Sequence, residues 1–366
     1  MKHSFTTRKG LSFLLFLGLF TTTFSTANCQ DSMIETDGMP FDCNSNLCLY
    51  TECATPPRFE IEATLLYLKP SIDDSHFVLS SFDNTFGGSL FPNGRRHGVS
   101  VPYTPGFRVE GLYNICPASS AFDIRFTYLE AHGSKSVTGD FLYDTNGFPG
   151  FGAQDSPVYA GTASDKNTYH VYTGDTTYNW SYGCFAPNDL TFIVGLHYAY
   201  IKFHEKGENT GVFIGTTRPI SNLLHRKSQF FGAGPEFGIN YEYLLPNFSC
   251  LGGTLTLNAN ARGALLYGST KSDMTFVTLR TGPVGVAFRN TPAWRITPMA
   301  SAELSLSYHV NCGCVPTVFE LGYEFMWYSK AVNKITGTDV AFSGDTIDVF
   351  NSLSLQGPYL SINASF

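Results

Sequence analysis

The chain has 366 residues, of which charged residues make up only 14% while aromatic residues reach 15%. Typical soluble domains carry roughly a quarter charged residues, so this composition excludes an ordinary soluble protein. Mean hydropathy is −0.04, and after residue 20 no apolar run approaches the roughly 20 residues of a spanning helix, which excludes a helical membrane protein. A formal net charge of −7 gives no electrostatic basis for binding nucleic acid. The class that combines few charges, many aromatics and average hydropathy is the membrane β-barrel.

The first 27 residues have the order of a secretory signal peptide. Lys2, Arg8 and Lys9 precede an apolar run over 11–20, and small polar residues follow up to Ala27. The alternative is a buried N-terminal helix, which the charge placement and the short run disfavour. Cleavage after Ala27 would remove three positive charges and no negative ones, which takes the formal net charge from −7 to −10.

Alternation of apolar and polar residues predicts ten strands of an antiparallel, up-and-down all-β barrel. In a membrane barrel the apolar half of each strand faces lipid and the other half faces the lumen. The predicted strands cover 59–69, 107–115, 121–131, 168–183, 190–203, 229–245, 254–268, 294–310 and 317–329, and a tenth ends at Phe366. Alternation over 77–81 and 284–288 leaves room for extra hairpins, so the predicted range is ten to sixteen strands.

The connections between these strands alternate in length. Four are short, at 116–120, 184–189, 246–252 and 311–316, and each contains Pro or Gly turn residues. The others are long and polar, at 70–106, 132–167, 204–228, 269–293 and 330–356. Because bacterial barrels have short periplasmic turns and long outer loops, both termini are predicted to lie in the periplasm.

The chain ends on an aromatic residue after a strictly alternating segment. Leu360, Ile362, Ala364 and Phe366 alternate with small polar residues. This resembles the closing strand of bacterial outer-membrane proteins, whose terminal Phe is read by the barrel-assembly machinery. The resemblance implies two partners, the outer-membrane lipid and that machinery, and localisation in the bacterial outer membrane.

The inward positions of the predicted strands carry most of the candidate site residues. Nine are acidic and four are basic, which would make an open lumen favour cations, because rings of acidic side chains set cation selectivity. The alternative is an interior filled by an ion-paired, hydrated network, since ten strands enclose a bore only slightly wider than one that side chains fill. The thirteen residues are Glu60, Glu62, Arg108, Glu110, Asp123, Arg125, Glu236, Glu242, Arg262, Arg295, Glu303, Glu320 and Glu324.

Nine cysteines fall outside the predicted strands, four before the first strand and five in the short connections. All nine are therefore predicted on the periplasmic side, which is oxidising, so disulfides are expected within the barrel or to neighbouring copies or other envelope proteins. The odd number leaves one thiol over or bonded to another chain. Alternatives are unbonded turn residues or a metal site, and the lack of a C-x-x-C pair disfavours a metal. The cysteines are Cys29, Cys43, Cys48, Cys53, Cys116, Cys184, Cys250, Cys312 and Cys314.

Four segments carry a resemblance to a known family. They are Phe-Phe-Gly-Ala-Gly-Pro-Glu-Phe-Gly at 230–238, Pro-Gly-Phe-Arg-Val at 105–109, the first strand at 59–70 and the closing segment at 359–366. Taken in chain order, they resemble the porin-like major outer membrane protein family of Legionella and of chlamydia-like bacteria. The resemblance implies an abundant surface barrel that serves as a porin or an envelope-structural protein, and sometimes as an adhesin. It covers the predicted barrel at 58–366 and leaves out the Cys-rich segment at 28–57, which is predicted to be periplasmic.

The leading functional hypothesis is a porin-like barrel that passes small hydrophilic solutes by passive diffusion and has an envelope-structural role through periplasmic disulfides. The alternative is a structural or adhesive protein whose closed barrel is an anchor and whose loops meet host surface ligands. Many strands favour the channel, whereas ten strands with a charged lumen favour the anchor. No catalytic constellation, metal site or cofactor is expected, and no Asp/His pattern of an outer-membrane protease is recognisable.

Overall fold

The computed structural model describes residues 58–73, 75–81, 94–116, 120–144, 159–181, 189–213, 219–245, 253–278, 284–312, 315–337 and 346–366. The predicted signal peptide at 1–27 and the Cys-rich segment at 28–57 lie outside these residues. So do seven of the nine cysteines, the exceptions being Cys116 and Cys312, which end strands of the barrel.

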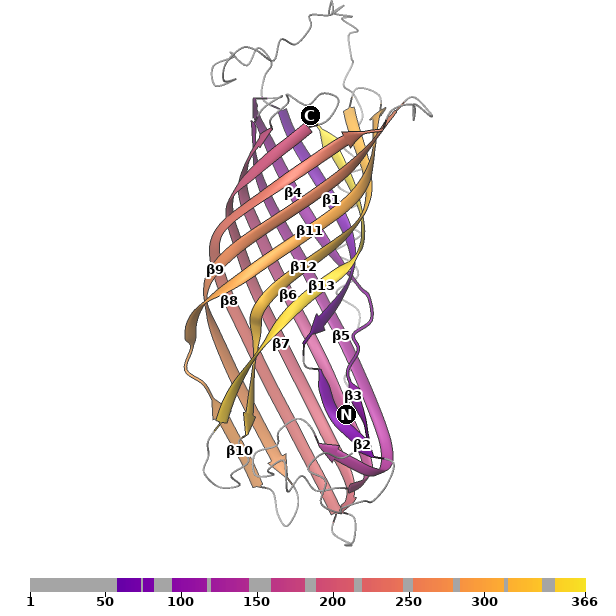
Figure 1. Cartoon of the computed structure of the whole chain (residues 1–366), viewed down its shortest axis with the longest axis vertical. Coiled ribbons are helices and arrows are strands. Elements are labelled where there is room, and N and C mark those ends of the chain that lie inside the picture. Colours follow the sequence, from indigo (N-terminus) through magenta and orange to yellow (C-terminus); the bar gives the residue numbers. More distant parts are fainter. Residues whose placement is uncertain are drawn as a thin grey trace, which may run out of the picture. The chain divides into compact units, whose positions relative to one another are not determined.

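Ten antiparallel strands form a closed ring, which confirms the predicted number (Figure 1). Each strand pairs with its neighbours in chain order, and β13 pairs with β1 from Glu60↔Ser365 to Ile72↔Leu353. The last residue takes part in this closure, because the Phe366 and Phe59 backbones exchange two hydrogen bonds of 2.9 and 3.3 Å. The ring consists of β1 (Arg58–Ile72), β4 (Thr104–Cys116), β5 (Ser120–Asp144), β6 (Tyr159–Ser181), β7 (Asp189–Phe213), β8 (Pro219–Leu244), β9 (Thr254–Thr278), β11 (Ala293–Cys312), β12 (Val315–Gly337) and β13 (Thr346–Ser365).

Three shorter strands lie outside the ring order. β2 (His76–Ser81) and β3 (Gly94–Gly98) form a hairpin, and β2 also pairs with β5. β10 (Val284–Arg289) pairs with β9. The alternation at 77–81 and 284–288 predicted additional strands there, and these segments are β2 and β10.

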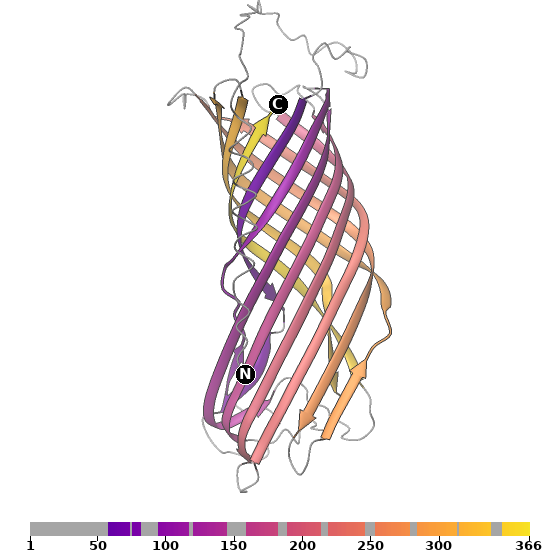
Figure 2. The same ribbon diagram turned by 180° about the vertical axis from the view of Figure 1, so that it is seen from behind.

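The strands from β5 onward are much longer than predicted. β5, β7 and β9 each have 25 residues and β8 has 26, whereas about 9–11 residues cross a membrane. The predicted loops at 132–167, 204–228, 269–293 and 330–356 are therefore mostly strand. Figure 2 shows β5 to β8 running from the end of the barrel near the C-terminus to the opposite end. Alternation fails there because beyond the lipid neither face of a strand has to be apolar. Among the described residues, no helix is long and apolar enough to span a membrane.

The half of the ring next to the short connections has an apolar outer face. Neighbouring residues on β1 differ sharply in exposure: Leu65 is 53% exposed and Leu66 is 0% exposed. Exposed aromatic and aliphatic side chains recur at alternate outward positions on the other strands, including Ile124 and Leu321. This face is the lipid-contacting band of the barrel.

Candidate functional site

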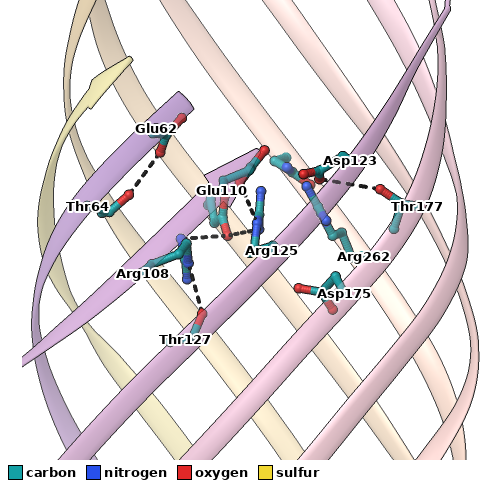
Figure 3. Close-up of polar contacts among 12 residues, drawn as sticks. Glu62, Thr64, Arg108, Glu110, Asp123, Arg125, Thr127, Asp175, Thr177 and Arg262 are labelled. Atoms are coloured by element: carbon teal, nitrogen blue, oxygen red, sulfur yellow. Dashed lines mark hydrogen bonds and ion pairs between the residues drawn. The ribbon is translucent and has the colours of Figure 1, made fainter. Parts of the chain in front are cut away.

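The first part of the candidate site is an ion-pair network inside the lipid-facing half. Arg108 on β4 donates to the Glu324 carboxylate on β12 at 2.5 Å, and its guanidinium also lies 3.7 Å from Glu303 on β11. Arg125 on β5 pairs with Glu110 at 2.6 Å and with the same Glu303 at 3.5 Å. Glu303 thus joins Arg108 and Arg125, which come from neighbouring strands. Figure 3 shows these two arginines close together.

A second group of polar residues lies beside this network. His197 on β7 contacts Asp175 through Nδ1, and its Nε2 lies 3.1 Å from the Tyr328 hydroxyl on β12. Arg262 on β9 lies 3.8 Å from Glu236 on β8. Thr177 donates a 3.4 Å hydrogen bond to Asp123, beside which Figure 3 also places Arg262.

Asp175, His197 and Glu236 are the described residues best placed to hold a metal ion, because their ligand atoms lie within 4.8 Å of one another. Both ring nitrogens of His197 are already engaged, however, by Asp175 and Tyr328. Glu236 faces the guanidinium of Arg262. His197 is therefore a hydrogen-bonded residue of the barrel wall, with no ring nitrogen left for a metal ion.

The remaining acidic residues border a polar cavity of about 420 Å³ at the end of the barrel with the short connections. Glu60 accepts hydrogen bonds from Asn114 at 2.7 Å and from Asn363 at 3.3 Å. Glu320 accepts from Ser307 at 2.9 Å and from the Tyr359 hydroxyl at 2.5 Å. Of the thirteen inward residues named in the sequence, those on the cavity wall are Glu60, Glu62, Arg108, Glu110, Arg125, Glu242, Arg262, Glu303 and Glu320.

Asp123, Glu236 and Glu324 are buried beyond the cavity wall, at 0–1% exposure. Arg295 is the member of the set that stays apart. Its guanidinium lies 4.1 Å from the centre of the Phe350 ring and donates to the Lys330 carbonyl oxygen.

An apolar layer fills the bore next to the ion-pair network. Its members come from nine of the ten ring strands and from Val101, which precedes β4. Its largest fully buried side chains are Tyr169, Tyr328, Phe203 and Phe230, at most 1% exposed. The Tyr169 and Phe203 rings are 5.1 Å apart. We define the apolar layer as Leu66, Leu68, Ile72, Val101, Leu129, Ala131, Tyr169, Val171, Ala199, Ile201, Phe203, Phe230, Ala264, Leu266, Met299, Met326, Tyr328, Ala331, Val332, Leu353, Leu355 and Tyr359.

This layer was not predicted from the sequence, because inward positions were identified by their polar side chains. A signal was present, since Leu66 and Leu68 continue the inward series of Glu60, Glu62 and Thr64. Where a strand contributes to the apolar layer, both faces of that strand are apolar. The alternation of apolar and polar residues along the strand then disappears. The run Leu65-Leu66-Tyr67-Leu68 is one such crossing.

A segment of β12 also enters the bore. The pairing of β12 with β13 shifts register between Tyr328 and Val332, and Lys330 has a positive φ of 54°. Residues 331–335 beyond this bulge are all buried. The Asn333 backbone N–H donates to the Ser228 hydroxyl on β8 at 2.9 Å, although β8 is not a neighbour of β12 in the ring.

A buried charged cluster anchors this inward segment beyond the lipid-facing band. Arg226 on β8 pairs with Glu205 on β7 at 3.3 Å and donates to the Ile335 carbonyl oxygen at 2.9 Å. Lys334 lies 3.6 Å from the same Glu205. Asp165 on β6 is 1% exposed, and its burial together with the charge of Glu205 raises its pKa to about 8. Sequence reasoning missed the cluster because its residues lie in predicted loops.

The comparisons with known proteins agree with this architecture. The family model for the Legionella pneumophila major outer membrane protein precursor matches residues 52–366. A search of curated proteins finds no match.

Solved structures similar to this chain include three outer-membrane barrels. The outer membrane protease OmpT of Escherichia coli is 9% identical with a TM-score of 0.45, over 84% of this chain and 95% of that one. The toluene transporter TodX of P. putida is 8% identical with a TM-score of 0.22, over 84% and 89% of the two chains. A FadL homologue of Pseudomonas aeruginosa is 9% identical with a TM-score of 0.24, over 85% and 90%.

The family match spans most of the sequence, including all ten strands of the ring. The chain therefore belongs to the Legionella major outer membrane protein family, whose place is the bacterial outer membrane.

Proposed function

We propose that this protein is a closed outer-membrane barrel that anchors a long extracellular β-structure at the cell surface and catalyses no reaction. The observation that carries the proposal is the apolar layer, which fills the bore with side chains from nine strands. The inward segment of β12 adds a second obstruction, held by hydrogen bonds and ion pairs to β7 and β8. Passive diffusion of solutes through the barrel would require both the apolar layer and the inward segment of β12 to move.

The charged network supports the same proposal. Arg108 and Glu324 have side-chain exposures of 4% and 0%, so they pair with each other and not with water. Ions that pass a selective pore replace part of their water shell with wall groups. Here Arg108 and Arg125 are already paired with the carboxylates of Glu324 and Glu110. The predicted cation selectivity thus depends on an opening of the bore.

The orientation of the barrel in the membrane follows from the difference between its two ends. Short connections lie at the end where β1 begins and β13 finishes, and the strands extend far on the opposite side. In bacterial barrels the short turns are periplasmic. The extended side, including the β2–β3 hairpin, is then the surface available to host ligands, as the adhesive alternative requires.

Solute flux into proteoliposomes tests the proposal. Liposomes that contain the folded full-length protein should swell in small sugars no faster than liposomes that contain the heat-unfolded protein. Faster swelling that decreases with the size of the sugar would support a diffusion pore and contradict the closed barrel.

An envelope-structural role through disulfides accompanies this proposal. Cys116 ends β4 and Cys312 ends β11, both at the end of the ring with the short connections. Oxidising conditions in the periplasm favour bonds between such thiols, in this chain or with neighbouring envelope proteins. Outer-membrane fractions should therefore show a band that shifts on reduction in a denaturing gel. Identical migration with and without reductant would contradict this role.

A further inference from the structure

A group of basic residues lies on the outer surface of the barrel just beyond the lipid-facing band. These residues occupy outward positions of four consecutive strands, β6 to β9. Lys166, Lys206 and Lys227 are exposed. We define the lysine patch as Lys166, Lys202, Lys206, Lys227 and Lys271 together with His170, His204 and His225.

The strand register fixes the depth of this patch. Tyr128, Tyr172, Tyr200 and Phe231 face one another across β5 to β8, with neighbouring ring centres 5.0, 5.9 and 6.4 Å apart. Such a row marks the boundary between the membrane core and the headgroups.

The first basic row, His170↔Lys202, follows this aromatic row two residues along each strand. That step corresponds to about 7 Å, at about 3.3 Å per residue. This first row therefore lies at the depth of the lipid headgroups, while Lys166 and Lys206, about 20 Å along the strands from the aromatic row, lie farther out.

The pairing places two positive groups opposite each other. Lys166 lies opposite Lys206, whereas Lys227 lies between His204 on β7 and Asp273 on β9. Like charges directly across a strand pair destabilise a sheet. Among the described residues, no carboxylate lies within ion-pair distance of Lys166, Lys206, Lys227 or Lys271. An anion placed between these side chains would relieve the repulsion.

The acidic residues that border the patch are fewer than its lysines. Asp273 pairs with Arg289 at 2.8 Å. Glu130 contacts His132 at 3.2 Å and His170 of the patch at 3.9 Å, and it accepts from the Tyr128 hydroxyl at 2.7 Å. Glu208 lies two residues beyond Lys206 on β7. The net charge of the patch is therefore positive.

Two histidines of the patch, His204 and His225, add neutral hydrogen-bonding groups. Burial and the neighbouring lysines hold the pKa values of His204 and His225 below the usual value. A neutral imidazole can donate one hydrogen bond to a phosphate oxygen, while an ammonium group supplies charge and up to three donors. This combination suits a phosphate group better than a carboxylate-bearing peptide.

We propose that the lysine patch binds the phosphate groups of the glycolipid in the outer leaflet. The inference rests on the orientation given in the proposed function, because only then does this side of the band meet the outer leaflet. The lipid-facing band below the patch would contact the acyl chains of the same lipid. Binding at this place would fix the height and tilt of the barrel in the membrane.

The test compares two triple variants of the full-length barrel, refolded in detergent. K202Q/K227Q/K271Q removes three charges from the part of the patch nearest the aromatic row. R95Q/R96Q/K135Q removes three exposed charges from β3 and the outer part of β5, and is the matched control. Native mass spectrometry would measure binding of lipid A with two, one or no phosphates.

Wild-type and control barrels should bind the bisphosphorylated lipid most tightly, and the patch variant should bind it on the order of a hundredfold more weakly, at ~1 kcal/mol per lysine. Equal binding by the patch variant, or equal binding of the phosphate-free lipid, would overturn the proposal. Displacement of all lipid by millimolar inorganic phosphate would overturn it too, in favour of a free-phosphate site.

Failure of the proposed orientation has a separate readout. A Lys206→Cys variant should react with a membrane-impermeant thiol reagent on intact cells after the lipid has been stripped by a chelator. Lipid binding in detergent without this labelling would contradict the orientation alone. Solute flux with normal lipid binding would contradict the closed lumen alone.

Discussion

Arg108 and Glu324 show at the scale of single residues how the interior is stabilised. Neither side chain has more than 4% of its surface exposed, and the two ionic groups are 2.5 Å apart. Removing one partner of a buried pair costs about 3–5 kcal/mol, because the other charge is left without compensation. Glu303 lessens this dependence by facing both Arg108 and Arg125.

Asp165 provides a residue-scale prediction about pH. Its pKa is about 8 in the folded protein because of burial and Glu205, with Lys334 and Arg226 acting in the opposite direction. An unfolded Asp has a pKa of about 3.9. Between these values the folded state binds more protons than the unfolded state, so this residue lowers stability as pH rises from 4 to 8.

Asp165→Asn should remove this dependence and stabilise the barrel at pH 8 by at least about 1 kcal/mol, with little effect near pH 4. The measurement is urea unfolding in detergent across this pH range. Asp140→Asn, which removes an exposed carboxylate from β5, is the matched control. Parallel pH profiles for D165N and wild type would contradict the assignment.

At the scale of elements, a glycine pair lets Phe230 reach the apolar layer. Gly232 on β8 lies directly opposite Gly268 on β9. A Cβ on Gly232 would lie 2.6 Å from the Phe230 ring, and a Cβ on Gly268 would lie 2.4 Å from the Phe231 carbonyl oxygen. Gly232, the first glycine of the motif at 230–238, is therefore explained by the close approach of two strands and one ring.

Gly268→Ala should destabilise the barrel by about 1–3 kcal/mol, because the new methyl group meets backbone that cannot move cheaply. Gly263→Ala on the same strand is the control, since a Cβ there would be 3.7 Å from its nearest neighbour, the Met299 carbonyl oxygen. Thermal unfolding followed by the gel shift of the folded barrel would measure both. Similar losses for the two variants would contradict this account of the glycine pair.

Elements also show where sequence reasoning worked and where it failed. The alternation around Glu110 and Arg125 located these residues correctly on β4 and β5, because lipid on one side forces a regular pattern. The pattern could not find Asp165 or Glu205, since the strands there lie beyond the lipid. It could not find Leu66 as a core residue, because an apolar side chain gives the same signal facing lipid or facing a packed bore.

At the scale of the whole molecule, one ring of ten strands serves two environments. The half near the short connections has an apolar outer face and an ion-paired interior. The far half has charged outer positions, including the lysine patch, and an interior held by Glu205, Arg226 and the inward segment of β12. The apolar layer lies between these interiors and separates them.

Planar-bilayer recording tests the closure of the bore most directly. The folded wild-type protein should give no steady conductance, and F203A/F230A, which removes two large side chains from the apolar layer, should leak ions. L304A/L321A truncates two lipid-facing side chains instead and should stay silent like the wild type. A stable, cation-selective conductance from the wild-type barrel would contradict the closed-anchor account, whether or not the variants fold.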